Sequence, residues 1–256
     1  MGVYIRDLLP YFIFRRLWGD RARWGLTPIQ SDPNWQEWQD KISTKSYLAN
    51  QRDGIGLKVC NLGYSVMSKV DVNEKTILEI GPGDIKHIDY WKELKPAKFI
   101  LADKSASMLD IAEKRLSDTN INYERILIPE NGKLSIKDES LDIVISFNSL
   151  EHIFPLKDYV RDISRFLKPG GILIGAIPSE GGFAWGAGRY LTTRRWMKKN
   201  SNIDLDKIIC WEHCNFADHI IEELDNNFNR EFLEFSPFKI PSIDLNLVIR
   251  YCYSKR

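Results

Sequence analysis

A glycine-containing turn between acidic residues is the first group in the sequence that could bind a ligand. Gly81-Pro82-Gly83-Asp84 closes the apolar run Thr76–Ile80, in which Glu79 is the one charged residue. Glycine lets a ligand approach the backbone, because a Cβ would fill that space. Asp103 ends the next apolar run, 22 residues after Gly81, where a carboxylate can accept hydrogen bonds from both hydroxyls of a ribose. The pattern predicts a cofactor that contains a nucleoside.

The charges around this turn favour a cationic cofactor over a dinucleotide. The Gly-x-Gly-x-x-Gly fingerprint requires a third glycine where Lys86 stands, and Asp84 puts negative charge where a pyrophosphate would lie. Glu79, within a run expected to be buried, needs a donor or a cation as partner. A nicotinamide-dependent oxidoreductase stays open as the alternative class.

Short apolar runs alternate with amphipathic stretches from Thr76 onward, and this rhythm predicts a doubly wound α/β fold. Parallel strands joined by right-handed crossovers place helices on both faces of a mostly parallel, seven-stranded sheet. Ligands bind such sheets at the carboxyl ends of the strands, where the glycine turn and Asp103 lie. The expected strands are 76–80, 99–102, 123–128, 141–147 and 172–177, with 231–238 and 244–253 as a late pair; the expected helices are 84–94, 105–116, 156–167 (stopped by 168–171) and 216–228.

The stretch from about Thr76 to Pro178 resembles the class I S-adenosylmethionine-dependent methyltransferases, in their small-molecule branch. Four segments carry the resemblance: the first motif at Leu78–Asp84, the second at Leu101–Leu109, the fourth at Leu141–Ser146 with Leu150-Glu151-His152, and the turn Leu167–Gly171 before the fifth strand. This family has a Rossmann-like fold, and its cofactor is S-adenosyl-L-methionine.

The resemblance implies which residues hold the cofactor. Glu79 and the backbone of the turn would hold its amino-acid end, and Asp103 would hold the ribose. Glu130 stands where the family usually has an Asp beside the adenine. Ser146-Phe147-Asn148-Ser149 lacks the Asn/Asp-Pro-Pro-Tyr/Phe signature of enzymes that methylate base nitrogens, which argues against a nucleic-acid acceptor. The full predicted cofactor set is Glu79, Gly81, Pro82, Gly83, Asp103, Lys104, Met108, Glu130, Ser146 and Asn148.

Two histidines are candidate catalytic residues, because an unperturbed His titrates near neutrality and can act as a general base. His152 follows the predicted fourth strand, and His213 lies in Cys210-Trp211-Glu212-His213-Cys214. Packing or helix capping is the alternative role for each. A closed zinc site needs four ligands, and no second Cys/His pair accompanies this run, so no metal is predicted.

Two segments lie outside the alternating pattern. Residues 178–215 are Gly-rich and then basic, and they form either a solvated helix or a lid whose Arg189, Arg194 and Arg195 bind an anionic group of the acceptor. Residues 1–50 form an aromatic, basic arm that lies on a membrane surface, packs on the core or crosses a dimer. The rest, residues 51–256, is the predicted methyltransferase domain, with 178–215 as its acceptor-binding insertion.

Composition limits the setting in which the protein acts. The chain has 256 residues, with 36 Lys and Arg against 35 Asp and Glu, so its net charge of +1 gives no global attraction to nucleic acid or membrane. Apolar runs fall short of the roughly 18 residues of a membrane span, and arginines interrupt any secretory signal at the start. Four cysteines indicate reduced thiols in the cytoplasm. We therefore expect a cytoplasmic protein. The basic segment after the fifth predicted strand, together with a general resemblance to methyltransferases of surface glycans, implies an enzyme that O-methylates a sugar in surface polysaccharide biosynthesis. A quinone-like or lipid acceptor at the inner face of the membrane is the alternative.

Overall fold

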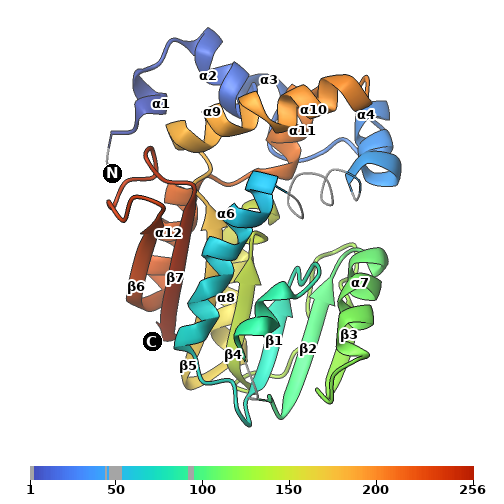
Figure 1. Ribbon diagram of the computed structural model, residues 1–256, viewed down its shortest axis with the longest axis vertical. Coiled ribbons are helices and arrows are strands. Elements are labelled where there is room, and N and C mark those ends of the chain that lie inside the picture. The colour runs from blue at the N-terminus through green and yellow to red at the C-terminus, as the bar shows by residue number, and fades with distance from the viewer. Residues whose placement is uncertain (1–2, 44, 46–53, 92–94) are drawn as a thin grey trace.

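A seven-stranded sheet with helices on both faces forms the body of the protein, and a layer of helices lies across one end of it (Figure 1). The computed structural model describes residues 3–43, 45, 54–91 and 95–256. The strand order is β3-β2-β1-β4-β5-β7-β6, and β7 runs antiparallel to both neighbours. The predicted, mostly parallel doubly wound sheet is confirmed. The strands are β1 Thr76–Ile80, β2 Lys98–Asp103, β3 Tyr123–Leu127, β4 Leu141–Phe147, β5 Leu167–Pro178, β6 Phe228–Ser236 and β7 Val248–Lys255.

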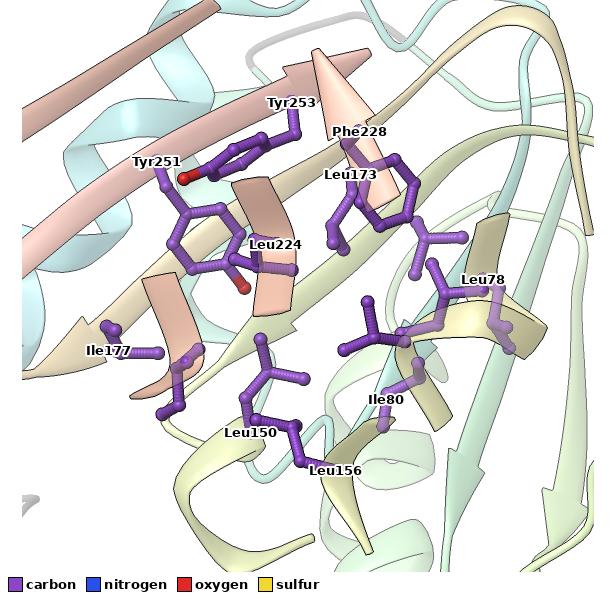
Figure 2. Packing of buried hydrophobic residues seen from close by; sticks show 14 of the residues in the cluster. Leu78, Ile80, Leu150, Leu156, Leu173, Ile177, Leu224, Phe228, Tyr251 and Tyr253 are labelled. Atoms are coloured by element: carbon purple, nitrogen blue, oxygen red, sulfur yellow. The ribbon is translucent and has the colours of Figure 1, made fainter. Parts of the chain in front are cut away.

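Alternate residues of the central strands are buried on opposite faces, which is why these strands are almost wholly apolar. On one face Leu78 and Ile80 pack with α8 and α12, and Figure 2 shows Tyr251 and Tyr253 of β7 in the same cluster. Ile77 belongs to the cluster on the other face, with α6, η3 and α7. The covering helices are α6 Gly54–Tyr64, η2 Ser65–Lys69, η3 Lys86–Tyr90, α7 Ala106–Leu116, η4 Leu150–His152, α8 Leu156–Phe166 and α12 Ala217–Asn227.

Several expected elements differ from the structure. The late strand pair, expected over 231–238 and 244–253, is Phe228–Ser236 and Val248–Lys255. In place of a helix over 84–94, the chain forms the short 3-10 helix η3, because Ile85 adopts φ 46° and interrupts a regular start; residues 92–94 lie outside the described part. Residues 168–171 are not a stop beyond the helix. Instead, α8 ends at Phe166, and 168–171 already belong to β5, across an irregularity in its pairing with β4.

The helices across the end of the sheet form one unit, which we call the cap (residues 3–43 and 183–212). The arm predicted for residues 1–50 contributes its described part and packs on the segment after β5, with a shared core around Trp35, Met197 and Trp211. A Cβ on Gly186 of α9 would lie 2.8 Å from the indole nitrogen of the fully buried Trp18, so glycine is needed at this contact. The cap contains α1 Ile5–Leu8, α2 Tyr11–Trp18, α3 Arg21–Trp24, α4 Pro33–Glu37, η1 Trp38–Ile42, α9 Phe183–Leu191, α10 Thr193–Asn200 and α11 Leu205–Glu212.

None of the helices in the described residues has both the length and the apolar character required to cross a membrane. The described cysteines Cys60, Cys210, Cys214 and Cys252 are all buried free thiols. Within the same ranges, no three His, Cys, Asp or Glu side chains are grouped so that they could hold a metal ion.

Candidate functional site

The turn after β1 is held tightly against the loop after β4. Gly81 adopts φ 67°, and a Cβ there would lie 2.8 Å from the Cβ of Ser149. The hydroxyl of Ser149 donates to the carbonyl of Ile80 (2.9 Å) and lies 2.7 Å from the hydroxyl of Ser146. Glycine at position 81 therefore meets a steric and a conformational requirement together. The contact fixes the relative position of two loops at the carboxyl ends of neighbouring strands.

Glu79 is a buried carboxylate that requires a cation. Its side chain is 1% exposed, Nε2 of His87 lies 3.4 Å from Oε2, and no hydrogen bond to either carboxylate oxygen is formed by the described residues. Burial, together with the charge of Asp84, raises the pKa of Glu79 well above its usual value. The ammonium group of an amino acid would supply hydrogen bonds to this carboxylate beside His87, so Glu79 fits the amino-acid end of S-adenosylmethionine.

Asp103 lies at the end of β2, beside the start of α7. One of its carboxylate oxygens accepts a hydrogen bond from the backbone N–H of Ser105 (2.8 Å), and Ser105 also caps α7. Burial raises the pKa of Asp103, which shows that the carboxylate is partly withdrawn from water. Its carboxylate can therefore accept hydrogen bonds from the hydroxyls of a ribose, as the sequence predicts.

The other predicted cofactor residues lie around the same edge of the sheet. Met108 is half-buried in the first turn of α7, and Lys104 is exposed. Glu130 is exposed on the turn after β3, the strand next to β2. Contact of these side chains with a cofactor stays a prediction.

Ser146 and Asn148 shape the loop after β4. The Ser146 carbonyl accepts a hydrogen bond from the hydroxyl of Tyr251 (3.0 Å), so its backbone is held from the β7 side. Asn148 adopts φ 49°, and its N–H donates to the carbonyl of Ala176 (2.9 Å). Left-handed backbone at a residue other than glycine is uncommon and is often retained at functional sites. We infer that this loop is shaped for a ligand.

The two candidate histidines, far apart in the sequence, meet beyond the ends of β4 and β5. The ring centroids of His152 and His213 are 4.9 Å apart. His152 ends the short helix η4 after β4, and His213 caps the end of α11. Burial raises the pKa of Asp103 and the charge of His152 partly offsets this shift, so His152 is on the Asp103 side of the predicted cofactor site.

His213 contacts a carboxylate that the sequence analysis did not single out. Its Nδ1 lies 3.0 Å from Oε2 of Glu180, a fully buried residue just after β5. Both carboxylate oxygens of Glu180 also accept hydrogen bonds from Arg189 (2.6 and 2.7 Å), and one accepts from the indole of Trp185 (2.9 Å). A carboxylate at Nδ1 favours the proton on that nitrogen and leaves Nε2, on the opposite side of the ring, to accept one.

His152 lies between two acidic side chains. Its Nδ1 is 3.3 Å from Oε2 of Glu212, and its Nε2 is 3.7 Å from Oε1 of Glu151. Trp38, from the N-terminal part of the cap, donates its indole N–H to Oε1 of Glu212 (2.5 Å). Burial raises the pKa of Glu151 to about 7.

The surroundings of the two histidines give them opposite charge states at neutral pH. Burial lowers the pKa of His213 below 6.5, although the charge of Glu180 opposes this shift. Burial also acts to lower the pKa of His152, but the hydrogen bond to Glu212 and the charge of Glu151 outweigh it and raise the pKa to about 9. A neutral His213 can accept a proton, whereas a cationic His152 can only donate.

The structure changes the interpretation of the basic residues after β5. Arg189 is 8% exposed and is paired with Glu180, so its charge is already neutralised within the chain and it is not retained as a ligand for an acceptor anion. Nη2 of Arg194 lies 2.5 Å from Oδ1 of Asp206, and Arg195 is exposed. A role in acceptor binding for these two arginines stays a prediction.

One further residue acts on the site through the backbone. Arg21 of α3 donates hydrogen bonds to the carbonyls of His213 (2.5 Å) and Cys214 (2.8 Å), and its guanidinium lies 3.6 Å from the ring centroid of Phe216. Burial lowers the pKa of Arg21 to about 10. No local motif marks this residue, because its partners are about 190 positions away. The N-terminal part of the cap thus fixes the loop that carries His213.

Comparisons with known proteins agree with this geometry. Residues 78–175 match the family model described as "Methyltransferase domain". A probable S-adenosylmethionine-dependent methyltransferase of Mycolicibacterium smegmatis is 29% identical over 74 residues, which are 28% of this chain and 29% of that protein. Erythromycin 3''-O-methyltransferase of Saccharopolyspora erythraea is 31% identical over 100 residues, 38% of this chain and 32% of that protein. The matched stretch thus spans about a third of these relatives.

Solved structures share the fold over most of the chain. An S-adenosylmethionine-dependent methyltransferase from Mesorhizobium loti superimposes with a TM-score of 0.51 at 19% identity, covering 74% of this chain and 95% of that one. The N-methyltransferase NodS from Bradyrhizobium japonicum, in complex with S-adenosyl-L-homocysteine, gives a TM-score of 0.56 at 13% identity, covering 88% and 99%.

Proposed function

We propose that the chain is a class I S-adenosylmethionine-dependent methyltransferase that methylates a hydroxyl oxygen of a small-molecule acceptor. The match of residues 78–175 to a methyltransferase-domain family model supports the first part of this proposal. The observation that carries this proposal is the placement of His213 beside His152, with their ring centroids 4.9 Å apart and Oε2 of Glu180 lying 3.0 Å from Nδ1 of His213. This proposal takes the place of the alternative that the sequence left open, a nicotinamide-dependent oxidoreductase, because the relatives are methyltransferases. Transfer to a hydroxyl differs from many other methyl transfers because the oxygen must lose a proton.

Different residues of the chain would bind the cofactor, remove the proton of the acceptor hydroxyl and orient the acceptor. When bound, S-adenosylmethionine supplies an electrophilic methyl group on a sulfonium. Glu79 would hold the ammonium of the cofactor's amino-acid end, and Asp103 would hold its ribose. Nε2 of His213 accepts the proton of the acceptor hydroxyl, and the cationic His152, with its side chain 35% exposed, donates a hydrogen bond that orients the acceptor.

Within this proposal the acceptor is a sugar hydroxyl, as in the biosynthesis of a surface polysaccharide. A similar protein whose name specifies a 3''-O-methyl transfer supports an oxygen acceptor. The cation at His152 suits an acceptor that is neutral or carries an anionic group. A lipid or quinone-like acceptor is the second candidate, favoured by the exposed apolar side chains of the cap.

An acceptor screen tests the function directly. The protein is incubated with S-adenosylmethionine and a panel of sugars, nucleotide sugars, amines and quinols, and products are detected by the mass of one added methyl group. The proposal predicts methylation of a hydroxyl compound and release of S-adenosylhomocysteine in equal amount. Methylation confined to amines or carbon atoms would contradict it.

Removal of the Asp103 carboxylate should weaken cofactor binding. Asp103→Ala is expected to lower the affinity for S-adenosylhomocysteine by about 1–3 kcal/mol, roughly 5- to 150-fold, because a partly buried acceptor of hydrogen bonds is lost. Isothermal titration calorimetry measures this affinity. Asp110→Ala, an exposed position on α7, serves as the matched control. Equal affinity of wild type and Asp103→Ala would show that the ribose binds elsewhere.

Arg21 is expected to act as a positioning residue for His213. Arg21→Met removes both hydrogen bonds to the carbonyls of His213 and Cys214 while keeping an apolar side chain against Phe216. We expect kcat to fall about tenfold, since small displacements of a catalytic group are costly, with the affinity for S-adenosylhomocysteine unchanged. Steady-state kinetics and calorimetry separate the two effects. The neighbouring exposed Arg23→Met should have wild-type kcat, and a fall in both variants would assign the effect to charge alone.

A further inference from the structure

Large apolar side chains are exposed where the N-terminal helices of the cap meet the loop between β6 and β7. Val3 and Leu8 are 75% and 74% exposed, and Phe238 of the loop is 65% exposed. The set that we call the apolar surface consists of Val3, Leu8, Phe12, Phe238, Ile240 and Leu245. Single exposed apolar residues are ordinary, but a group of this kind on adjoining segments marks an interaction site.

One buried carboxylate joins the segments that carry this surface. Asp244 is 8% exposed; its Oδ2 accepts a hydrogen bond from the N–H of Ile5, and its Oδ1 accepts one from the N–H of Phe183 (3.0 Å each). The loop is thereby tied to α1 and to the start of α9. Figure 1 shows the loop beside α1, close to the N-terminus. Leu245 follows the joining residue directly, so the exposed side chains of loop and helix belong to one region.

The loop is held in shape from within. Asn246 is fully buried; its Oδ1 accepts from the N–H of Phe238 (2.9 Å), and its Nδ2 donates to the carbonyls of Ile240 (2.8 Å) and Ser242 (2.9 Å). These bonds fix the tip while Phe238 and Ile240 point to solvent. The exposure of these side chains is therefore built into the fold and does not reflect a lack of internal contacts.

Basic side chains accompany the apolar ones. On α2, the exposed Phe12, Arg15 and Arg16 share one face, because residues three and four positions apart are neighbours on a helix. The two arginines also line a cleft that contains Asp20, Asp204 and Asp206. In the loop, the exposed Lys239 stands between Phe238 and Ile240. Long basic side chains can place their charge among lipid phosphates while neighbouring apolar groups enter the acyl boundary.

We propose that the apolar surface, with Arg15, Arg16 and Lys239, binds an anionic lipid bilayer. The mixture of protruding aliphatic, aromatic and basic groups is typical of a monotopic interfacial contact. The inference does not depend on the chemistry at His213, and it would place the cap, and the site that it covers, at a membrane surface.

Vesicle sedimentation tests the proposal. The full chain is mixed with vesicles of phosphatidylcholine, or of phosphatidylcholine with phosphatidylglycerol, at low and at high salt. We expect binding to the vesicles that contain phosphatidylglycerol, weakened by salt because the basic groups are exposed. Phe238→Ser combined with Ile240→Ser should lower the partition coefficient at least about tenfold. Arg15→Gln with Arg16→Gln should reduce the preference for anionic lipid, and the further change Lys239→Gln should abolish it.

Matched controls distinguish specific membrane binding from non-specific adsorption of exposed apolar side chains, and they are independent of the proposed function. Leu127→Ser removes a side chain that is 57% exposed in β3, at the opposite edge of the sheet, and should bind vesicles like wild type. No binding to either vesicle, or equal binding of the Phe238/Ile240 variant, overturns the proposal. The proposal is also overturned if light scattering detects a dimer of the wild-type chain that is absent in the Phe238/Ile240 variant. Sedimentation needs no cofactor or acceptor, so its outcome is independent of methyl transfer.

Discussion

Replacement of His213 by Gln is expected to lower kcat by about 10²- to 10⁴-fold at pH 7, the usual contribution of a general base. Gln keeps a polar side chain of similar length but cannot accept the proton that leaves the acceptor hydroxyl. Affinity for S-adenosylhomocysteine should be unchanged, because His213 is not among the predicted cofactor residues, which lie on β1, β2, β4 and the segments that follow β1 to β4. The measurement is steady-state kinetics with the acceptor identified by mass shift.

A second histidine provides the control for this substitution. His219 lies on α12 with its side chain 60% exposed, and His219→Gln should retain the kcat of the wild type. Retained turnover in His213→Gln would remove the base from the mechanism and would favour an acceptor that needs no deprotonation, such as a neutral amine. A parallel loss of cofactor affinity would point instead to a damaged fold.

The pH dependence should separate the two histidines. Burial lowers the pKa of His213 below 6.5, so kcat should rise with pH as this ring loses its proton and should then stay level through pH 7. The hydrogen bond from His152 to Glu212 outweighs burial and holds the pKa of His152 at about 9, so acceptor binding should weaken above that pH, where the cation is lost. His213→Gln should lose the acidic limb, and His152→Gln the alkaline one. Because the rings are 4.9 Å apart, each substitution should also shift the remaining limb.

Much of the fold could be predicted from sequence because the central strands are buried on both faces. Thr76–Ile80 and Leu141–Phe147 are strands with the predicted bounds, since uninterrupted apolar residues between turn signals leave few alternatives. Prediction failed where one backbone angle decides the outcome. The apolar spacing after Asp84 is helical, but Ile85 at φ 46° limits the segment to a 3-10 turn.

Residues of the candidate site could be predicted from sequence where a local motif marks them, and could not where their partners come from distant segments. Glu79 and Asp103 follow from short motifs whose geometry is set by one strand and its turn. Glu180 and Arg21 do not, because their partners come from distant segments and neither lies in a periodic pattern. His152 and His213 could be named as single candidates, whereas their pairing depends on how α11 returns the chain to the end of β4. Arg189 illustrates the converse: its charge in the sequence suggested ligand binding, but in the structure the buried Glu180 already pairs with it. Acceptor binding by Arg194 and Arg195 stays a prediction.

Replacement of Glu180 by Ala should cause the largest loss of stability. The substitution leaves the charge of Arg189, 8% exposed, without its carboxylate, and breaking a buried pair in this way costs about 3–5 kcal/mol. Urea unfolding followed by circular dichroism measures the free energy of unfolding. Burial acts to raise the pKa of Glu180, but the charge of Arg189 outweighs it and holds this pKa below its usual 4.5. The stability that Glu180 contributes is therefore present above pH 4.5 and is lost as the pH falls further. Exposed Glu222→Ala on α12 is the control.

A double variant distinguishes the structural role of Glu180 from its role at His213. Glu180→Met with Arg189→Met replaces the pair by apolar side chains, and such exchanges often restore stability to about that of the wild type or better. If Glu180 only neutralises Arg189, kcat should recover together with stability. If it also holds the proton on Nδ1 of His213, kcat should stay low in a protein that is folded and binds S-adenosylhomocysteine normally. We expect the second result, because an imidazole without this carboxylate is free to present a protonated Nε2 to the acceptor hydroxyl.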